Sequence, residues 1–161
     1  MSDERKLEKA MFGAGCFWGV QDEFSHVKGV VNTTVGYAGG TFENPTYQDV
    51  CAERTGHAEV VLVEYDPHEV AYEDLLKKFW EIHDPTTMNR QGPDTGSQYR
   101  SIIFYFTPEQ KQLAETSKAE LEKSGKRPNP VVTQIIPASP FFPAEEYHQN
   151  YLHKKGVHVC H

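Results

Sequence analysis

The feature of this sequence with the clearest chemical potential is a cysteine set among glycine and aromatic residues. The segment 13–19 has the sequence GAGCFWG, with Cys16 at its centre. The glycines before Cys16 allow a tight turn, and residues 16–26 can then form a helix that begins at the cysteine. A thiol at the first turn of a helix faces unpaired backbone N–H groups and the positive end of the helix dipole, which favours its thiolate form. Cys16 is therefore predicted to be a nucleophile.

Two aromatic side chains, Phe17 and Trp18, follow the cysteine directly. Neighbouring residues cannot share one face of a helix, so we expect at least one of the two rings to point elsewhere, into a pocket. Such a pocket would give the sulfur of Cys16 an apolar wall. The alternative is that both rings are ordinary core residues of an amphipathic helix.

The other cysteines of the chain, Cys51 and Cys160, lie far from Cys16 and from each other. An odd number of cysteines at such wide spacing does not match the disulfide framework of a small secreted domain. Each cysteine therefore has either a role in thiol chemistry or a buried, structural role.

Hydrophobic periodicity predicts an alternation of strands and helices. Pro108 favours the first turn of a helix and Gly125 favours its end. Two long polar connections, 38–57 and 84–100, exceed what simple connection requires, so we expect functional residues in them. The alternation predicts helices packed on a mixed sheet in one α/β domain that spans residues 1–161. We expect strands at 9–13, 30–37, 58–65, 101–106 and 131–137, and helices at 16–26, 71–83 and 108–124.

The charge and hydropathy of the chain exclude two classes of partner. The formal net charge of −7 argues against a polyanion, because phosphate binding rests on clustered Lys and Arg. No apolar run approaches the length that crosses a bilayer, and the charged start, residues 1–10, lacks the apolar region of a secretory signal. We therefore expect a cytoplasmic protein that binds neither nucleic acid nor membrane.

Six short motifs occur in order between about residue 10 and residue 153. Any one of them could arise by chance, whereas six in this order make coincidence an unsatisfactory explanation. The set resembles the signature of the methionine sulfoxide reductase A family. The motifs are GCFWG (15–19), GYAGG (36–40), PTY (45–47), TGHAE (55–59), HDPT (83–86) and DTGSQYR (94–100).

The resemblance implies a ferredoxin-like two-layer sandwich, of α/β (α+β) class, with a mixed sheet and helices packed on it. Residues 1–8 would form a polar lead, and residues 138–161 a loop-rich tail that carries the resolving cysteine. The implied reaction is reduction of the S epimer of methionine sulfoxide, free or within oxidised proteins, and hence protein repair. The implied reductant is thioredoxin or a dithiol, with no metal or other cofactor. We expect a monomer.

Catalytic residues follow from the same resemblance, position by position. Cys16 corresponds to the nucleophile that attacks the sulfoxide sulfur and becomes a sulfenic acid. Glu59 corresponds to the acid that protonates the sulfoxide oxygen, which requires a dry site because this carboxyl must keep its proton near neutral pH. Tyr47 and Tyr99 correspond to two phenols that hydrogen-bond this oxygen. Asp94 corresponds to a carboxylate that orients the substrate or a bound water.

The resemblance also assigns the substrate wall and the recycling thiol. Phe17 and Trp18 correspond to the walls that receive the methyl group of the sulfoxide, an apolar contact worth about 1 kcal/mol. Cys160 corresponds to the resolving cysteine, which condenses with the sulfenic acid of Cys16 to give a disulfide. We expect thioredoxin to reduce this disulfide directly. Cys51 falls where the family commonly has a cysteine that does not recycle the enzyme, so we expect a structural role for it.

Other interpretations of the same residues stay open at this point. The sequence HVCH at 158–161 suggests metal binding, but its spacing matches no standard zinc motif. A cysteine hydrolase would need a histidine base beside Cys16, and His57 and His148 are candidates, although the resemblance implies a structural role for His148. A non-catalytic module could bind hydrophobic peptides in the aromatic pocket. On the residues alone, Glu59 would be expected on the exposed face of a strand.

Overall fold

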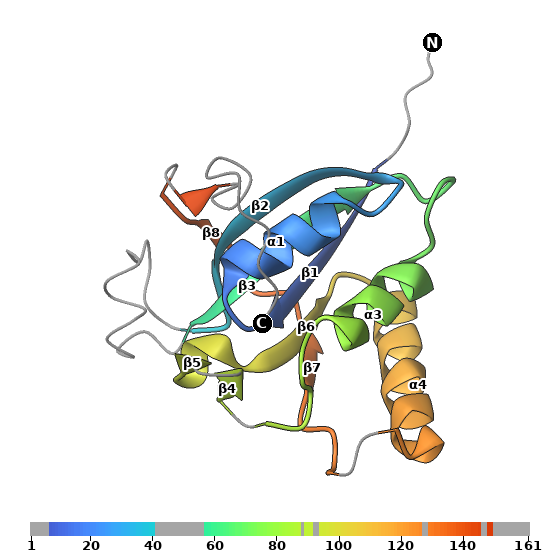
Figure 1. The fold of residues 1–161 in the computed structure, drawn as a ribbon. Helices are drawn as coiled ribbons and strands as arrows, with labels where there is room; N and C mark the ends of the chain where they lie inside the picture. Colours follow the sequence, from blue (N-terminus) through green and yellow to red (C-terminus); the bar gives the residue numbers. More distant parts are fainter. Residues whose placement is uncertain are drawn as a thin grey trace.

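A mixed six-stranded sheet forms the centre of the fold (Figure 1). The computed structural model describes residues 7–40, 57–87, 89–91, 94–126, 129–145 and 148–149. The strands of the sheet are β1 (Glu8–Ala14), β2 (Val30–Ala38), β3 (Ala58–Tyr65), β6 (Ser101–Tyr105), β7 (Gln134–Pro137) and β8 (Phe142–Pro143). Their order is β7-β6-β1-β3-β2-β8, and every neighbouring pair is antiparallel except β6 and β7, which are parallel.

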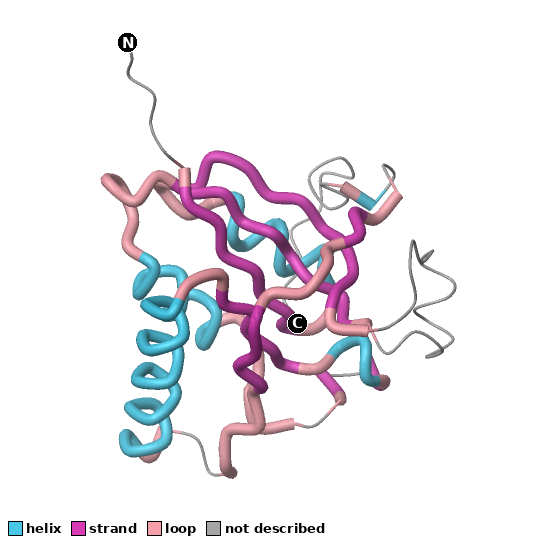
Figure 2. Tube along the Cα trace, turned by 180° about the vertical axis from the view of Figure 1, so that it is seen from behind, coloured by secondary structure: helices cyan, strands magenta, loops and turns pink. Residues whose placement is uncertain are grey.

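Four of these strands and two helices form a ferredoxin-like unit. Helix α1 (Phe17–Ser25) connects β1 to β2, and helix α3 (Tyr72–Glu81) connects β3 to β6. The chain order βαββαβ and the strand order β6-β1-β3-β2 are those of the ferredoxin-like fold, so the expected two-layer architecture is confirmed. Both helices cover one face of the sheet, which faces the viewer in Figure 1 and lies behind the strands in Figure 2.

The alternation of side chains along the strands divides the core in two. On the helical face, Phe12 of β1 stacks on Phe24 of α1 at 5.1 Å and on Phe79 of α3 at 5.2 Å between ring centroids. On the opposite face, Met11 belongs to a smaller cluster that also contains Phe104 and that Phe141 helps to cover. Both faces of the sheet are therefore buried, which holds the carboxyl end of β1 in a fixed position.

Helix α4 (Pro108–Ser124) begins and ends at the predicted residues. Thr107 caps its first turn, because the Thr107 side chain accepts a hydrogen bond from the backbone N–H of Gln110 at 3.1 Å. Gly125 ends the helix in the left-handed conformation, with φ of 70°. These two signals are local, so the sequence alone predicts them correctly.

The structure differs from the sequence prediction in its short elements. The connection 84–100 contains three of them, β4 (Arg90–Gln91), β5 (Asp94–Thr95) and the 3-10 turn η1 (Ser97–Tyr99), and the tail contains β8. The strand expected at 131–137 is shorter and begins only at Gln134. Of the predicted polar lead, Glu8 already belongs to β1, and residues 1–6 lie outside the described part. No helix within the described ranges is long and apolar enough to cross a bilayer.

Candidate active site

Cys16 lies at the junction of β1 and α1. It is the N-cap residue of α1, directly before the first helical residue, Phe17. Gly15 turns the chain at this junction with φ of 100°, a conformation that glycine adopts without steric cost. The Cys16 side chain is only partly buried. The thiol therefore lies beside the positive end of α1 and keeps access to solvent, as a nucleophile requires.

Glu59, the predicted acid, lies beside this junction. It is the second residue of β3, and only 1% of its surface is exposed, so it is not on the exposed face of a strand. Its Oε1 accepts a hydrogen bond from the backbone N–H of Phe17 at 3.2 Å. That N–H belongs to the first turn of α1, where backbone donors have no partner within the helix. The carboxyl group is thus bound to the residue that follows Cys16.

Gly13 allows β1 to lie close to both of its neighbours, β6 and β3, at this point. A Cβ atom at Gly13 would lie 2.7 Å from Cγ2 of Ile102 and 3.2 Å from the carbonyl oxygen of Glu59. Both distances are shorter than ordinary contacts of a Cβ atom, and the second neighbour is backbone that cannot rotate away. The first glycine of the GAGCFWG segment therefore serves packing, whereas Gly15 serves the turn.

The two aromatic residues after Cys16 are buried to different degrees, and both contact His148. Phe17 is fully buried, and its ring lies 5.7 Å from that of Tyr37. Trp18 is partly buried, and its indole N–H donates a hydrogen bond to Nδ1 of His148 at 3.0 Å. The imidazole of His148 also lies against both rings, at 5.4 Å from Phe17 and 5.6 Å from Trp18 between centroids. The three rings form one aromatic cluster beside the N-terminus of α1.

His148 acts in this cluster as a hydrogen-bond acceptor. An indole N–H can only donate, so Nδ1 of His148 is unprotonated and the neutral ring carries its proton on Nε2. Burial lowers the pKa of His148 below its ordinary value, and the nearby Glu145 opposes this shift. The neutral form is the one that can bind Trp18. Sequence reasoning assigned His148 only a structural role and missed this contact, which joins residues 130 positions apart.

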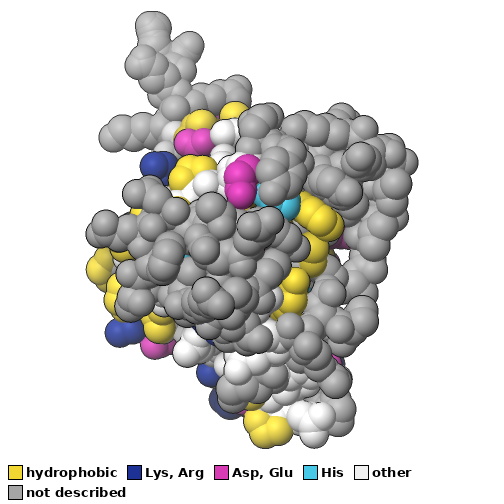
Figure 3. Space-filling model, turned by 90° about the vertical axis from the view of Figure 1, so that its left-hand side faces the viewer, with side chains coloured by type: hydrophobic (Ala, Val, Ile, Leu, Met, Phe, Trp, Pro, Cys, Tyr) yellow, Lys and Arg dark blue, Asp and Glu magenta, His cyan; other side chains and the backbone are white. Residues whose placement is uncertain are grey.

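The geometry argues against the hydrolase interpretation. The Nδ1 atom of His57 accepts the backbone N–H of Gly40 at 2.9 Å, and its ring packs edge-on against Phe142 at 5.5 Å. The Nδ1 atom of His148 is bound to Trp18. Because Nδ1 of each ring accepts a hydrogen bond, the neutral ring carries its proton on Nε2, and neither nitrogen has a free lone pair for the proton of a thiol. Figure 3 shows a face of the molecule on which histidine, acidic and hydrophobic side chains adjoin one another.

The remaining predicted site residues are only partly described. Tyr99 ends η1, which packs against β3, and its side chain is partly buried. Asp94 lies in β5, and the structure describes only its backbone. Tyr47, Cys51 and Cys160 lie outside the described residues.

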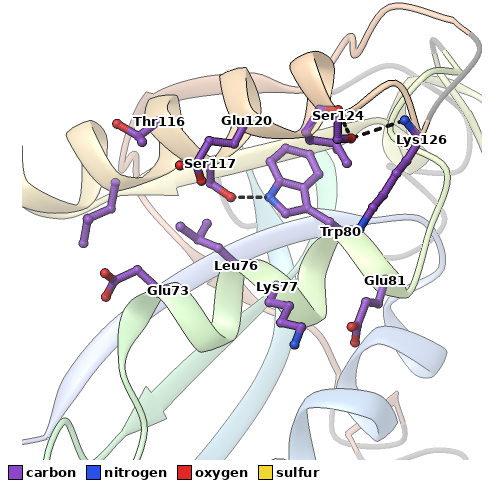
Figure 4. Close-up of a pocket in the computed structure, with 12 residues that line it drawn as sticks. Glu73, Leu76, Lys77, Trp80, Glu81, Thr116, Ser117, Glu120, Ser124 and Lys126 are labelled. Carbon is purple, nitrogen blue, oxygen red and sulfur yellow. Dashed lines mark hydrogen bonds between the residues drawn. The ribbon is translucent and has the colours of Figure 1, made fainter.

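A groove of about 650 Å³ lies elsewhere, between α3 and α4 (Figure 4). Its lining includes Leu76 and Trp80, and the indole N–H of Trp80 donates to Oγ of Ser117 at 2.7 Å. None of the predicted site residues that the structure describes lines this groove. The candidate active site is therefore identified by the position of the Cys16 thiol and not by the volume of this groove.

Within the described residues, no group of three His, Cys, Asp or Glu side chains could hold a metal ion. The HVCH sequence at 158–161 lies outside the described part of the chain. Cys16, Glu59 and the aromatic cluster combine a partly exposed thiol, a buried carboxyl and a set of aromatic rings near the N-terminus of α1.

Comparisons with known proteins agree with this chemistry. The sequence profile of the family described as "Peptide methionine sulfoxide reductase" matches residues 8–161. The chain is 60% identical over 160 residues to the "Peptide methionine sulfoxide reductase MsrA" of Methanoculleus marisnigri, which covers 99% of this chain and 98% of the relative. The crystal structure of Mxr1 from Saccharomyces cerevisiae in reduced form superposes with a TM-score of 0.90 at 36% identity, over 99% of this chain and 92% of that chain. A structure of Mxr1 in complex with Trx2 superposes with a TM-score of 0.65 at 25% identity, over 94% and 88% of the two chains. The chain belongs to the peptide methionine sulfoxide reductase family.

Proposed function

We propose that Cys16 is the nucleophile and Glu59 the acid of this methionine sulfoxide reductase. The sulfur of Cys16 attacks the sulfur of the sulfoxide while Glu59 gives a proton to the sulfoxide oxygen. This attack forms a bond between the two sulfurs. The protonated oxygen then moves to the sulfur of Cys16, and both the sulfur–sulfur bond and the bond between the oxygen and the methionine sulfur break. Cys16 is thereby oxidised to a sulfenic acid, and the sulfoxide is reduced to the thioether of methionine.

The hydrogen bond between Phe17 and Glu59 carries this proposal. It ties a buried carboxyl to the residue that follows the thiol. Burial removes the water that would stabilise a carboxylate, whereas the N–H of Phe17 at the N-terminus of α1 stabilises it. Cys16 at the N-cap of α1 has the helix dipole to favour its thiolate. A partly exposed thiol and a buried carboxyl thus both lie at the N-terminus of α1, which supports attack and protonation on one substrate.

The aromatic cluster supplies the binding of the methyl group. Trp18 is partly buried and offers apolar surface near the thiol, and the buried ring of Phe17 belongs to the same cluster. His148 holds the indole by accepting its N–H. Tyr47 and Tyr99 hydrogen-bond the sulfoxide oxygen, and Asp94 orients the substrate or a water. The packing of η1 against β3, the strand that carries Glu59, supports this role for Tyr99.

Recycling proceeds through a second thiol. The sulfhydryl of Cys160 condenses with the sulfenic acid of Cys16 to form a disulfide and release water, and Cys51 has a structural role. Thioredoxin is the reductant: its dithiol is oxidised as it reduces the disulfide. The complex of the related Mxr1 with Trx2 supports this partner. The reaction requires no metal or organic cofactor.

We also propose that the enzyme is a monomer in which residues 1–161 act as one catalytic domain. The substrate is the S epimer, free or within oxidised proteins, and its reduction repairs oxidative damage. A cytoplasmic location fits this chemistry, because the cytosol keeps thiols reduced.

Turnover of the two sulfoxide epimers tests the proposal. We expect the S epimer alone to be reduced, no turnover for Cys16→Ser, and loss of only the thioredoxin-driven activity for Cys160→Ser. Normal recycling in Cys160→Ser together with failure in Cys51→Ser would assign the resolving role to Cys51. Release of an acyl group from a thioester would favour a hydrolase. Binding without turnover, retained in Cys16→Ser, would favour a peptide-binding module.

A further inference from the structure

The side chain of Gln149 replaces a strand residue at the edge of the sheet. Its Oε1 accepts the backbone N–H of Val35 at 2.9 Å, and its Nε2 donates to the carbonyl oxygen of Val35 at 3.0 Å. The same Nε2 donates to the carbonyl oxygen of Ala144 at 3.0 Å. Val35 lies in β2 and is fully buried. One carboxamide thus pairs both backbone groups of Val35, as a residue of a neighbouring strand would do.

Gln149 continues a contact that β8 begins. Strand β8 pairs with β2 at Gly36 and Tyr37, and the next backbone bond runs from the N–H of Ala144 to the carbonyl of Val35 at 2.9 Å. The chains approach closely, since a Cβ atom at Gly36 would lie only 2.5 Å from the carbonyl oxygen of Phe142. The hydrogen bonds between β2 and the C-terminal segment therefore continue past β8 and Ala144 to the carboxamide of Gln149.

The residue before Gln149 in the chain is His148, which accepts the indole N–H of Trp18. We propose that Gln149 is a positioning residue for the methyl wall of the active site. It fixes His148 relative to β2, and His148 in turn fixes the indole of Trp18 beside Cys16. The proposal rests on the proposed role of Trp18 in binding the methyl group. It makes Gln149 a determinant of selectivity for S-methyl over larger S-alkyl sulfoxides.

Gln110 offers a matched control, because its carboxamide makes the same kind of contact away from the site. Its Oε1 accepts the N–H of Phe106 at 2.9 Å, and its Nε2 donates to the carbonyl of Lys9 at 2.8 Å. Gln149→Met and Gln110→Met each remove a carboxamide that bridges backbone groups and keep the length of the side chain. We expect both to lower the unfolding temperature. Only Gln149→Met should raise KM, on the order of tenfold with kcat within about twofold, and reduce the preference for S-methyl over S-ethyl sulfoxides.

A spectroscopic readout separates positioning from general loosening. The chain has two tryptophans, so Trp80→Phe leaves Trp18 as the sole indole. In that background we expect Gln149→Met to shift the Trp18 emission to longer wavelength and Gln110→Met to leave it unchanged. Adding Gln149→Met to His148→Gln should raise KM no further, because both changes act on the same indole. Gln149→Asn, too short to reach both groups of Val35, serves where the Met variant does not fold.

The outcomes distinguish this inference from the proposed function. If the Gln149 variants keep the wild-type KM, the wild-type preference for S-methyl sulfoxides and the wild-type emission of Trp18, the positioning role of Gln149 is wrong. The proposed function would be unaffected by that result. Equal changes in the Gln110 variant would overturn the positioning role as well, because they would show a general effect of lost stability. Absence of sulfoxide turnover in the unchanged enzyme would instead reject the proposed function.

Discussion

The backbone N–H of Phe17 and Oε1 of Glu59 lie 3.2 Å apart and join two segments separated by 42 residues. The donor belongs to the first turn of α1, and the acceptor belongs to a buried side chain of β3. This bond brings the Glu59 carboxyl to the N-terminus of α1, directly after the N-cap residue Cys16. The position of the proposed acid relative to the proposed nucleophile is therefore set by the pairing of β1 with β3 and by the turn into α1.

The Glu59→Gln variant should keep the fold but reduce methionine sulfoxide much more slowly. The amide oxygen of Gln can still accept the N–H of Phe17, but the side chain has no acidic proton to give to the sulfoxide oxygen. We expect single-turnover reduction to slow by about 10²- to 10⁴-fold, the usual contribution of a general acid. Glu64→Gln, on the same strand, is the control and should react at the wild-type rate. A Glu59→Gln variant with wild-type kinetics would assign the proton donor to another group.

The Gly15→Ala variant should change the position of the Cys16 thiol, because it strains the backbone turn before Cys16. Gly15 has φ of 100°, where an L residue with a Cβ atom is strained by about 1 kcal/mol or more. Gly125→Ala is a matched control, since Gly125 has φ of 70° and open space around a Cβ atom. Thermal unfolding should show a loss of stability in both variants. Alkylation of Cys16 by iodoacetamide should slow only in Gly15→Ala, and an equal rate in both would contradict the role of Gly15 in placing the thiol.

The pH dependence of stability should report on His148. Burial lowers the pKa of His148 in the folded state below its value in the unfolded chain, which is about 6.5. The unfolded chain then binds the proton more readily, so this contribution to stability is complete above about pH 6.5 and is lost as the pH falls through the lower folded pKa.

A His148→Gln variant removes this titration. We expect its stability between about pH 7 and pH 5 to fall less steeply than that of the unchanged protein, as measured by denaturant unfolding at each pH. KM of the unchanged enzyme should rise at the acid end of this range, because protonated His148 cannot accept the indole N–H of Trp18. Identical pH profiles for the two proteins would contradict a neutral, buried His148.

Trp80→Phe should separate the groove between α3 and α4 from catalysis. The change removes the hydrogen bond from the Trp80 indole to Ser117 and is expected to cost about 1 kcal/mol of stability. Because no described site residue lines this groove, kcat and KM for methionine sulfoxide should stay at their wild-type values. A large rise in KM would show that the groove takes part in substrate binding.

Local signals in the sequence predict the elements that local chemistry controls. Thr107, Pro108 and Gly125 define α4 through capping and backbone conformation within a few residues, so its bounds are predictable. The glycine turn before Cys16 is predictable for the same reason. The burial of Glu59 does not follow from its neighbours in sequence, and only the family resemblance points to it before the fold is known.

Contacts between distant segments are the part that the sequence does not reveal. The bond from Trp18 to His148 and the pairing of Gln149 with Val35 span more than a hundred residues, and neither has a local signature. Strand β8 is too short to give a hydrophobic pattern. It can lie beside β2 because Gly36 has no side chain that would collide with the backbone of Phe142. Tertiary packing, rather than propensity, decides these features.

The most direct test of the account is a single turnover in Cys160→Ser. One equivalent of the S epimer is added to the reduced protein, methionine is quantified, and the cysteines are located by mass spectrometry after trapping of sulfenic acid. We expect one methionine to be released per chain and one oxygen atom to be added to the sulfur of Cys16. Methionine release with the oxygen on Cys51, or with no oxidised cysteine, would contradict it.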